Sequence, residues 1–105
     1  MLVTTAEIDE IRKEPGEKEL RLYLVVERGE WLLPRALWML QEKLNAYASW
    51  ALDGLMQQTY PWAKPENVRI VVRSHGQAPK DAIELIEKAG SMLAAEGPML
   101  SFEQA

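Results

Sequence analysis

The chain contains no cysteine among its 105 residues. Disulfides, thiolate nucleophiles and zinc sites built on sulfur are therefore excluded. It has a single histidine, His75, and no acidic loop of the calcium-binding type, so we expect neither a metal nor another cofactor. The glycine-rich phosphate loops and the G-x-S-x-G motif of serine hydrolases are also missing. Because no acid–base pair stands out either, the sequence favours a protein that is not an enzyme.

Basic clusters and long apolar runs are scarce as well. The formal net charge is −4 and lysines and arginines form no block, which argues against nucleic acid as a partner. No uninterrupted apolar run reaches the length of about 18 residues that indicates a membrane span. The first residues lack the basic and apolar regions of a signal peptide. We therefore predict a cytoplasmic protein that does not act on membranes.

The residues that are present indicate an ordinary folded domain. Hydrophobic residues make up 48% of the chain and charged residues 27%, values typical of soluble globular proteins. A chain of this length forms one hydrophobic core rather than two. We expect residues 1–105 to form a single α/β domain.

The N-terminal part of the chain predicts a β-hairpin over residues 7–27. Apolar residues alternate with polar ones over residues 19–27, which is the pattern of a strand with one buried face. Pro15 and Gly16 provide a turn before that strand. A helix over residues 7–13 is the alternative, because a Thr-x-x-Glu pattern at its start resembles a helix capping box.

Four further elements follow, and together they define a fold class. The periodicity predicts a long helix over residues 31–60, a strand over 67–74, a helix over 79–96 and a strand over 99–103. The order is then β-β-α-β-α-β. Right-handed crossovers between parallel strands place both helices on the same side of the sheet. We predict an α+β or α/β two-layer sandwich, with a four-stranded mixed sheet and two helices on one face.

The long helix has more apolar surface than one core needs. One stripe predicts the core face (Leu37, Leu40, Leu44, Ala48, Ala51 and Leu55). Met39, Ala46 and Trp50 project from nearly the opposite side. Because tryptophan and methionine are enriched in interface cores, we predict that this second side forms a homodimer interface. The alternative is that the chain's own loops or N-terminal arm cover it.

A second candidate site lies where the two predicted parallel strands end. Arg28 follows the first strand, and Ser74, His75 and Gln77 follow the next, before a predicted helix. Ligands favour the carboxyl ends of parallel strands, and a helix N-terminus can hold an anion. These residues therefore indicate a site for a small anionic ligand or metabolite. The alternative is that glycine and polar residues here form only the turn between a strand and a helix.

Three segments resemble a family of small, uncharacterised bacterial proteins. They read LQEKLNAYASWALDG (residues 40–54), TYPWAKPENVRIVVR (residues 59–73) and IELIEKAGSMLAAEG followed by LSFE near the C-terminus. The family is similar in its short hairpin, its LQEKLNAY-like long helix and its YP-x-A-K link into a strand, and the resemblance covers residues 7–103. Many members have an acidic connection before the long helix, where this chain reads ERGEWLLP. The family has no known activity, so the resemblance implies a fold and no site.

Overall fold

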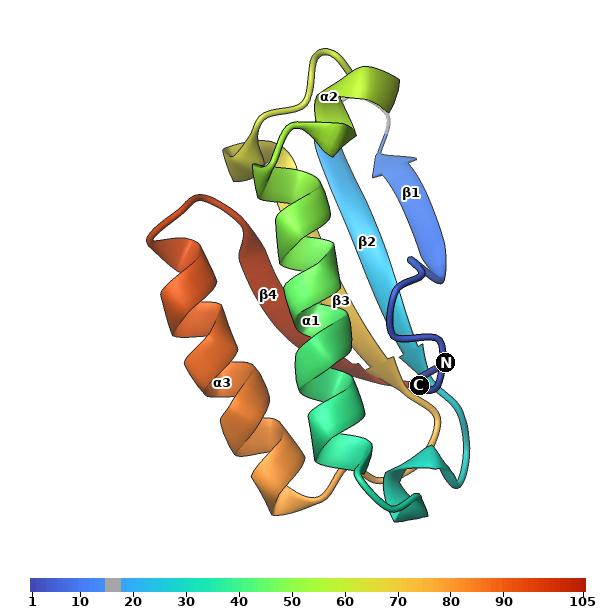
Figure 1. Cartoon of the computed structure of the whole chain (residues 1–105). Coiled ribbons are helices and arrows are strands. Elements are labelled where there is room, and N and C mark those ends of the chain that lie inside the picture. The colour runs from blue at the N-terminus through green and yellow to red at the C-terminus, as the bar shows by residue number, and fades with distance from the viewer. Residues whose placement is uncertain (15–17) are drawn as a thin grey trace.

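The computed structural model describes residues 1–14 and 18–105. Its strands form one sheet in the order β1-β2-β3-β4 (Figure 1). The strands are β1 (Glu10–Glu14), β2 (Glu19–Val26), β3 (Val68–Ser74) and β4 (Met99–Gln104). The helices are α1 (Ala36–Leu52), α2 (Leu55–Thr59) and α3 (Lys80–Ala94), with the short 3-10 helices η1 (Glu30–Leu32) and η2 (Pro65–Asn67). The predicted β-β-α-β-α-β order is confirmed.

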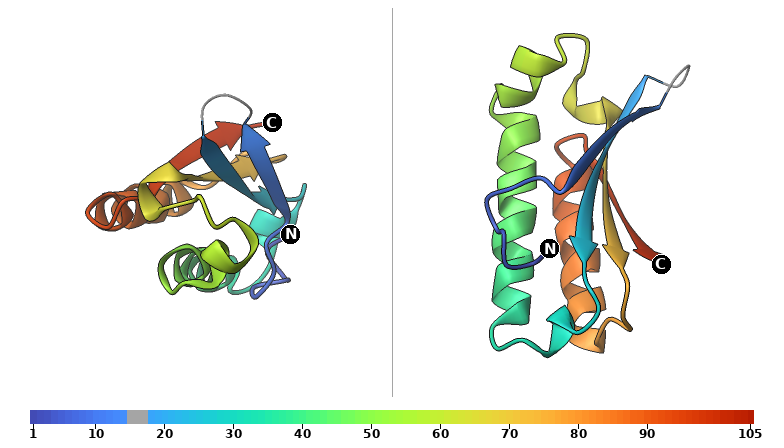
Figure 2. Two further views of the ribbon diagram at one scale, coloured as in Figure 1. Left: turned by 90° about the horizontal axis from the view of Figure 1, so that it is seen from above. Right: turned by 90° about the vertical axis from the view of Figure 1, so that its right-hand side faces the viewer.

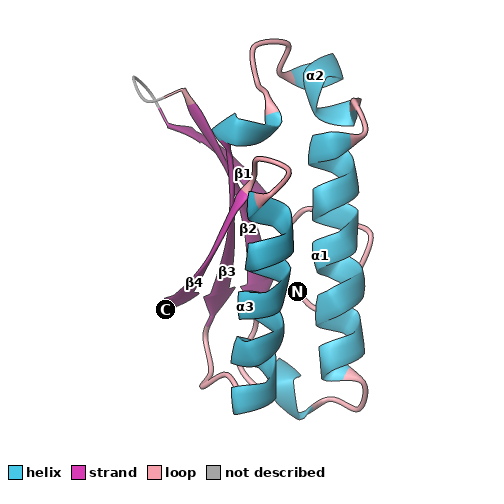
Figure 3. Ribbon diagram, turned by 90° about the vertical axis from the view of Figure 1, so that its left-hand side faces the viewer, coloured by secondary structure: helices cyan, strands magenta, loops and turns pink. Residues whose placement is uncertain are grey.

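The molecule has two layers. β1 pairs antiparallel with β2, whereas the β2–β3 and β3–β4 pairs are parallel. Both parallel connections cross the sheet in the same direction, so their helices α1 and α3 lie side by side on one face (Figures 2 and 3). The other face of the sheet carries no helix. The predicted mixed sheet with helices on one face is therefore confirmed.

The N-terminal pairing decides between the two sequence-based alternatives. Glu10 to Glu14 pair with β2, so this segment is a strand and not a helix. The strand begins at Glu10 rather than at residue 7, and the segment before it is a loop. The predicted turn at Pro15 and Gly16 lies outside the described residues.

The prediction of one continuous helix over residues 31–60 is wrong. Arg35, immediately before α1, has a left-handed backbone with φ 67°, and Gly54, immediately before α2, has φ 93°. A left-handed residue interrupts the right-handed helical path, which glycine permits at low cost. The stretch is therefore divided into η1, α1 and α2. The 17 residues of α1 span about 26 Å. Within the described residues, every helix is too short or too polar to span a lipid bilayer.

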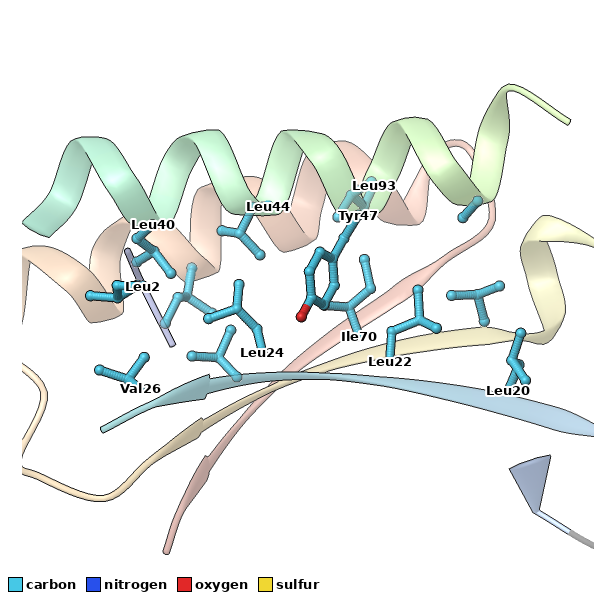
Figure 4. Close-up of a cluster of buried hydrophobic side chains, with 14 of the residues drawn as sticks. Leu2, Leu20, Leu22, Leu24, Val26, Leu40, Leu44, Tyr47, Ile70 and Leu93 are labelled. Carbon is cyan, nitrogen blue, oxygen red and sulfur yellow. The ribbon is translucent and has the colours of Figure 1, made fainter. Parts of the chain in front are cut away.

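The core lies between α1, α3 and the covered face of the sheet. Alternate residues of β2 and β3 point into it, as the strand period of two requires. The side chains at its centre are at most 3% exposed (Leu20, Leu22, Leu24, Val26, Leu40, Leu44, Tyr47, Val68, Ile70 and Val72). Figure 4 shows the Tyr47 ring descending from α1 with its hydroxyl group turned toward the strands. That hydroxyl donates a hydrogen bond of 2.7 Å to the Tyr23 carbonyl oxygen.

The helix-free face of the sheet is covered by charged side chains instead. Tyr23 lies on it but is only 2% exposed, because the guanidinium groups of Arg12 and Arg73 stack on its ring at 5.2 and 4.4 Å. Arg21 pairs with Glu19 at 2.7 Å on the same face. Paired charges and a shielded tyrosine leave little apolar surface there for a partner.

Candidate functional site

The predicted anion site lies at one end of the sheet, as expected from the topology. The loop after β2 and the loop after β3 meet there, and the His75 N–H donates to the Val26 carbonyl oxygen at 2.9 Å. Arg28, His75 and Gln77 are exposed. An anion held by these three side chains would remain in contact with bulk water, which weakens charge interactions.

Ser74, the fourth predicted ligand, has a structural role in this loop cluster. It is fully buried, and its hydroxyl accepts a hydrogen bond of 2.8 Å from Trp31 Nε1 and donates to the Gly76 carbonyl oxygen. Its own carbonyl oxygen accepts from Gln104 Nε2 at 3.0 Å and from the Ala105 N–H at 2.8 Å. The hydrogen bonds of Ser74 therefore link η1, the loop after β3 and the end of β4.

The N-terminus of α3 is also poorly suited to bind an anion. Pro79 precedes the helix, and the N–H groups of Ala82 and Ile83 already donate to its carbonyl oxygen at 3.0 and 3.2 Å. Asp81 places a carboxylate in the first turn, where the helix dipole favours negative charge and an incoming anion would meet repulsion. Within the described residues, no group of three or more metal-binding side chains is present. Anion binding at Arg28 and His75 stays a prediction.

The second apolar side of α1 is partly covered by this chain. Met39, Ala46 and Trp50 are all half-buried, and Met39 and Trp50 pack against the core. The Trp50 ring meets the Tyr60 ring edge-on, with 6.3 Å between centroids. The N-terminal segment passes along this side of α1 before it enters β1 (Figure 2, right). Self-association through these residues stays a prediction, but the free apolar area is smaller than the sequence suggests.

A buried lysine anchors that N-terminal segment, and the sequence did not reveal it. Lys43 lies on α1 beside Met39 and is fully buried. Its Nζ donates to Thr4 Oγ1 at 2.9 Å, to Asp9 Oδ1 at 2.7 Å and to the Met1 carbonyl oxygen. All three ammonium donors are thus used, which is what a buried charge requires. This set of contacts is called the Lys43 anchor below.

The carboxylate of the Lys43 anchor is held in its charged form. Burial of Asp9 opposes ionisation, but hydrogen bonds from Lys43, from the terminal amine and from the Val25 N–H outweigh burial and lower its pKa. Tyr47 completes the arrangement, because its hydroxyl accepts from the Asp9 N–H at 2.9 Å. Burial raises the pKa of the Tyr47 phenol well above its ordinary value, so it remains a neutral hydrogen-bonding group. The anchor is satisfied within itself and presents no free reactive group.

The outer edge of β4 is a further open feature of the sheet. Within residues 1–14 and 18–105, β4 pairs with β3 alone and forms one end of the sheet. Its sequence, MLSFEQ, includes one charged residue in six. An edge strand without charges, proline or a covering element is a ready template for another strand.

A hollow of about 520 Å³ lies along this edge, between β4 and α3. Apolar side chains and a glycine dominate its lining (Ile83, Ile86, Gly90, Ala94, Leu100 and Phe102), together with Glu87, Ser91 and Ser101. Leu100 and Phe102 belong to the core-facing side of β4 yet remain half-buried. The outermost strand therefore has an incompletely covered inner face.

The whole chain, residues 1–105, matches a known protein family described as a family of unknown function, DUF6572. The chain belongs to DUF6572. No curated protein and no solved structure matches it. The predicted resemblance to an uncharacterised family is therefore confirmed.

In this DUF6572 chain, the Lys43 anchor and the hydrogen-bonded cluster around Ser74 are internally satisfied, whereas the hollow beside β4 is lined mainly by apolar groups. The β4 edge is not evident from the sequence alone. The two edge strands differ in charge, EIRKE in β1 against MLSFEQ in β4. This difference indicates an open edge only when the strand order is known.

Proposed function

We propose that the protein is a non-enzymatic interaction domain that forms a homodimer by antiparallel pairing of β4 with β4 of a second copy. The observation that supports the proposal is the edge of β4, which has Glu103 as its one charged residue and an apolar hollow beside it. A second copy suits this edge because the same half-covered apolar side chains then meet across a two-fold axis.

The backbone alternation identifies the groups available for pairing. The Ala105 N–H donates to Ser74 of β3, so the backbone groups of residues 99, 101 and 103 also point toward β3. Those of Leu100, Phe102 and Gln104 consequently point to the free edge. With the two-fold axis at Ser101, Leu100 of one copy hydrogen-bonds to Phe102 of the other, and their side chains lie on the core-facing side.

The pairing extends both layers of the fold. Two four-stranded sheets become one sheet of eight strands, and the helices of both copies lie on the same face. Each copy's β4 then fills part of the other copy's hollow beside Ile86 and Gly90. Burial of Leu100 and Phe102 supplies the hydrophobic contribution, and the new main-chain hydrogen bonds supply the register. Because the paired segment is short, the interface lies at the small end of specific interfaces, and we expect a micromolar dissociation constant.

Sedimentation equilibrium of the wild type and of Ser101→Lys tests this proposal. The wild type should approach twice its chain mass of 12.0 kDa at tens of micromolar. Ser101→Lys places two like charges at the two-fold axis on an exposed edge, and the variant should remain a monomer. Ser49→Lys, the same change on the exposed surface of α1, is the matched control and should dimerise like the wild type.

Two outcomes would overturn the proposal. One is a wild type that stays monomeric at these concentrations. The other is a dimer that survives Ser101→Lys with unchanged affinity. If Trp50→Ala disrupts that surviving dimer, the interface lies on the half-buried side of α1 instead.

A further inference from the structure

A continuous furrow, lined by side chains of both helices, runs between α1 and α3. It consists of two adjoining hollows of about 180 and 460 Å³, which share Leu44, Asn45, Ala89 and Met92 in their linings. On α1 the lining extends from Leu37 to Leu52, a rise of about 23 Å at 1.5 Å per residue. The furrow thus has the length of a helix of about four turns.

The floor of the furrow is apolar and its lining side chains are short at the middle. Leu44 and Leu93 close it from below and are 3% and 8% exposed. Ala48 and Ala89 are half-buried on either side, so the middle of the furrow is lined by methyl groups. Short side chains at a contact allow two helices to approach closely. Met92 stands at the rim with 76% of its surface exposed, a flexible apolar side chain of the kind that adapts to a partner.

The charges around the furrow are mainly negative. The α3 rim carries the carboxylates of Asp81, Glu84 and Glu96 against the ammonium groups of Lys88 and of Lys80, which lies 4.0 Å from Glu84. The α1 rim offers the amides of Gln41 and Asn45 and no charged residue. An apolar floor beside a net negative rim is complementary to a helix with one apolar and one basic face.

We propose that this furrow binds a cationic amphipathic helix of a partner protein. Apolar residues at i, i+4, i+7 and i+11 of the partner fill the floor, and its lysines or arginines face Asp81, Glu84 and Glu96. A second copy of this chain is a poor occupant, because its exposed helix α3 brings the same acidic side chains. An anionic lipid surface is repelled by the same rim.

This proposal does not depend on dimer formation through β4. The furrow lies between α3 and α1, whereas the hollow of the β4 edge lies between α3 and β4. A monomeric variant such as Ser101→Lys should therefore bind the helix as well as the wild type does. A variant that loses dimer formation but still binds the helix, or the reverse, separates the two proposals.

The test is fluorescence anisotropy with two labelled peptides of about 16 residues, the length that matches the furrow. Both have leucine at i, i+4, i+7 and i+11; one has lysine at the remaining solvent positions and the other has glutamate. The lysine peptide should bind wild-type protein, and its dissociation constant should rise with ionic strength. The glutamate peptide should bind at least about tenfold more weakly, through repulsion from the rim.

Met92→Lys provides the matching change on the protein. It removes an apolar contact and adds positive charge to the rim, so the dissociation constant for the lysine peptide should rise about tenfold. Leu32→Lys is the control, because Leu32 is 88% exposed on η1 and outside the furrow lining. Amide chemical-shift changes on titration should be centred on residues 37–52 and 81–96.

Three results would overturn the proposal. Equal binding of the lysine and glutamate peptides would show apolar adhesion without charge recognition. Absence of binding to either peptide, or shift changes centred outside both helices, would show that the furrow is not the binding surface.

Discussion

The two edges of the sheet are built in opposite ways. At one edge, β1 has four charged residues in five, and the segment before it is tied to α1 by the Lys43 anchor. At the other edge, β4 has one charged residue in six and an apolar hollow beside it. Charged side chains are a usual protection of an edge strand, and β1 has far more of them than β4.

The difference shows where a small sheet can gain a partner without risk of open-ended growth. With one edge protected, pairing at β4 stops at two copies, because the outer strand of each copy is then β1. If both edges resembled β4, the same contact would lead to fibres. The proposed dimer therefore depends on the closed edge as well as on the open one.

Breaking the Lys43 anchor tests the protected edge and should have the largest effect. Lys43→Met removes the buried cation from Asp9, which keeps only the exposed terminal amine as a charged partner, and removes the Lys43 contacts of the N-terminal segment. Removal of one partner from a buried ion pair costs about 3–5 kcal/mol, and we expect that loss in the free energy of unfolding by urea titration. Lys88→Met on the exposed surface of α3 is the control. A change below about 1 kcal/mol would show that the anchor is not needed for stability.

Acidification should remove part of the same free energy of unfolding. The pKa of Asp9 is lowered in the folded protein, so its charged form contributes stability that is complete above the unfolded value of about 4. That contribution is lost as the pH falls through the folded pKa. Wild type should therefore exceed Asp9→Asn in stability at neutral pH, and the difference should shrink steadily below about pH 4. A difference that is constant from pH 7 to pH 2 would contradict this role for Asp9.

Gly97 positions the open edge, and its replacement should have a moderate effect. Gly97 precedes β4 with φ 118°, and a Cβ atom there would lie 3.0 Å from the Glu66 backbone nitrogen and from Pro65 Cβ. Gly97→Ala is therefore strained in both backbone and packing, and should lower the free energy of unfolding by about 1–3 kcal/mol. Thermal unfolding followed by circular dichroism measures the loss. A melting temperature equal to that of the wild type would exclude this strain.

Gly90 beside the open edge should behave in the opposite way and more weakly. It lies within α3, and a Cβ atom there would lie 3.6 Å from Leu100 Cβ, an ordinary contact. Gly90→Ala should therefore raise the stability of the monomer by about 0.5–1 kcal/mol through its higher helix propensity. The same thermal scan on the monomeric Ser101→Lys background isolates this effect. Destabilisation would mean that α3 and β4 are packed more tightly than these distances indicate.

Much of the fold follows from sequence periodicity. Alternation in β2 and β3 requires strands with one buried face, and the helical spacing of residues 80–94 requires an amphipathic helix. These local patterns, with the handedness of parallel crossovers, determined the element order and the two layers. Apolar periodicity did not reveal the left-handed residues that divide residues 31–60, because it reports which side of a segment is apolar and not its backbone angles. Asp53-Gly54 is a turn signal in the sequence, whereas Arg35 gives none.

The candidate sites were less accessible to sequence reasoning. The role of Ser74 depends on Trp31, which is distant in sequence, and that of Lys43 depends on Thr4 and Asp9. A lysine among apolar helix residues predicts an exposed side chain, since burial of a charge is costly unless partners from elsewhere surround it.

The sequence by itself determined the order of the main strands and helices and the apolar periodicity within them, because these depend on spacing along the chain. Only the tertiary structure decided which apolar faces remain open. Whether β4 is an edge, whether the N-terminal segment covers α1, and whether α1 and α3 leave a furrow all depend on contacts between distant segments. Local propensity carries no information about those contacts, and the surfaces proposed here for binding exist only once the layers have packed.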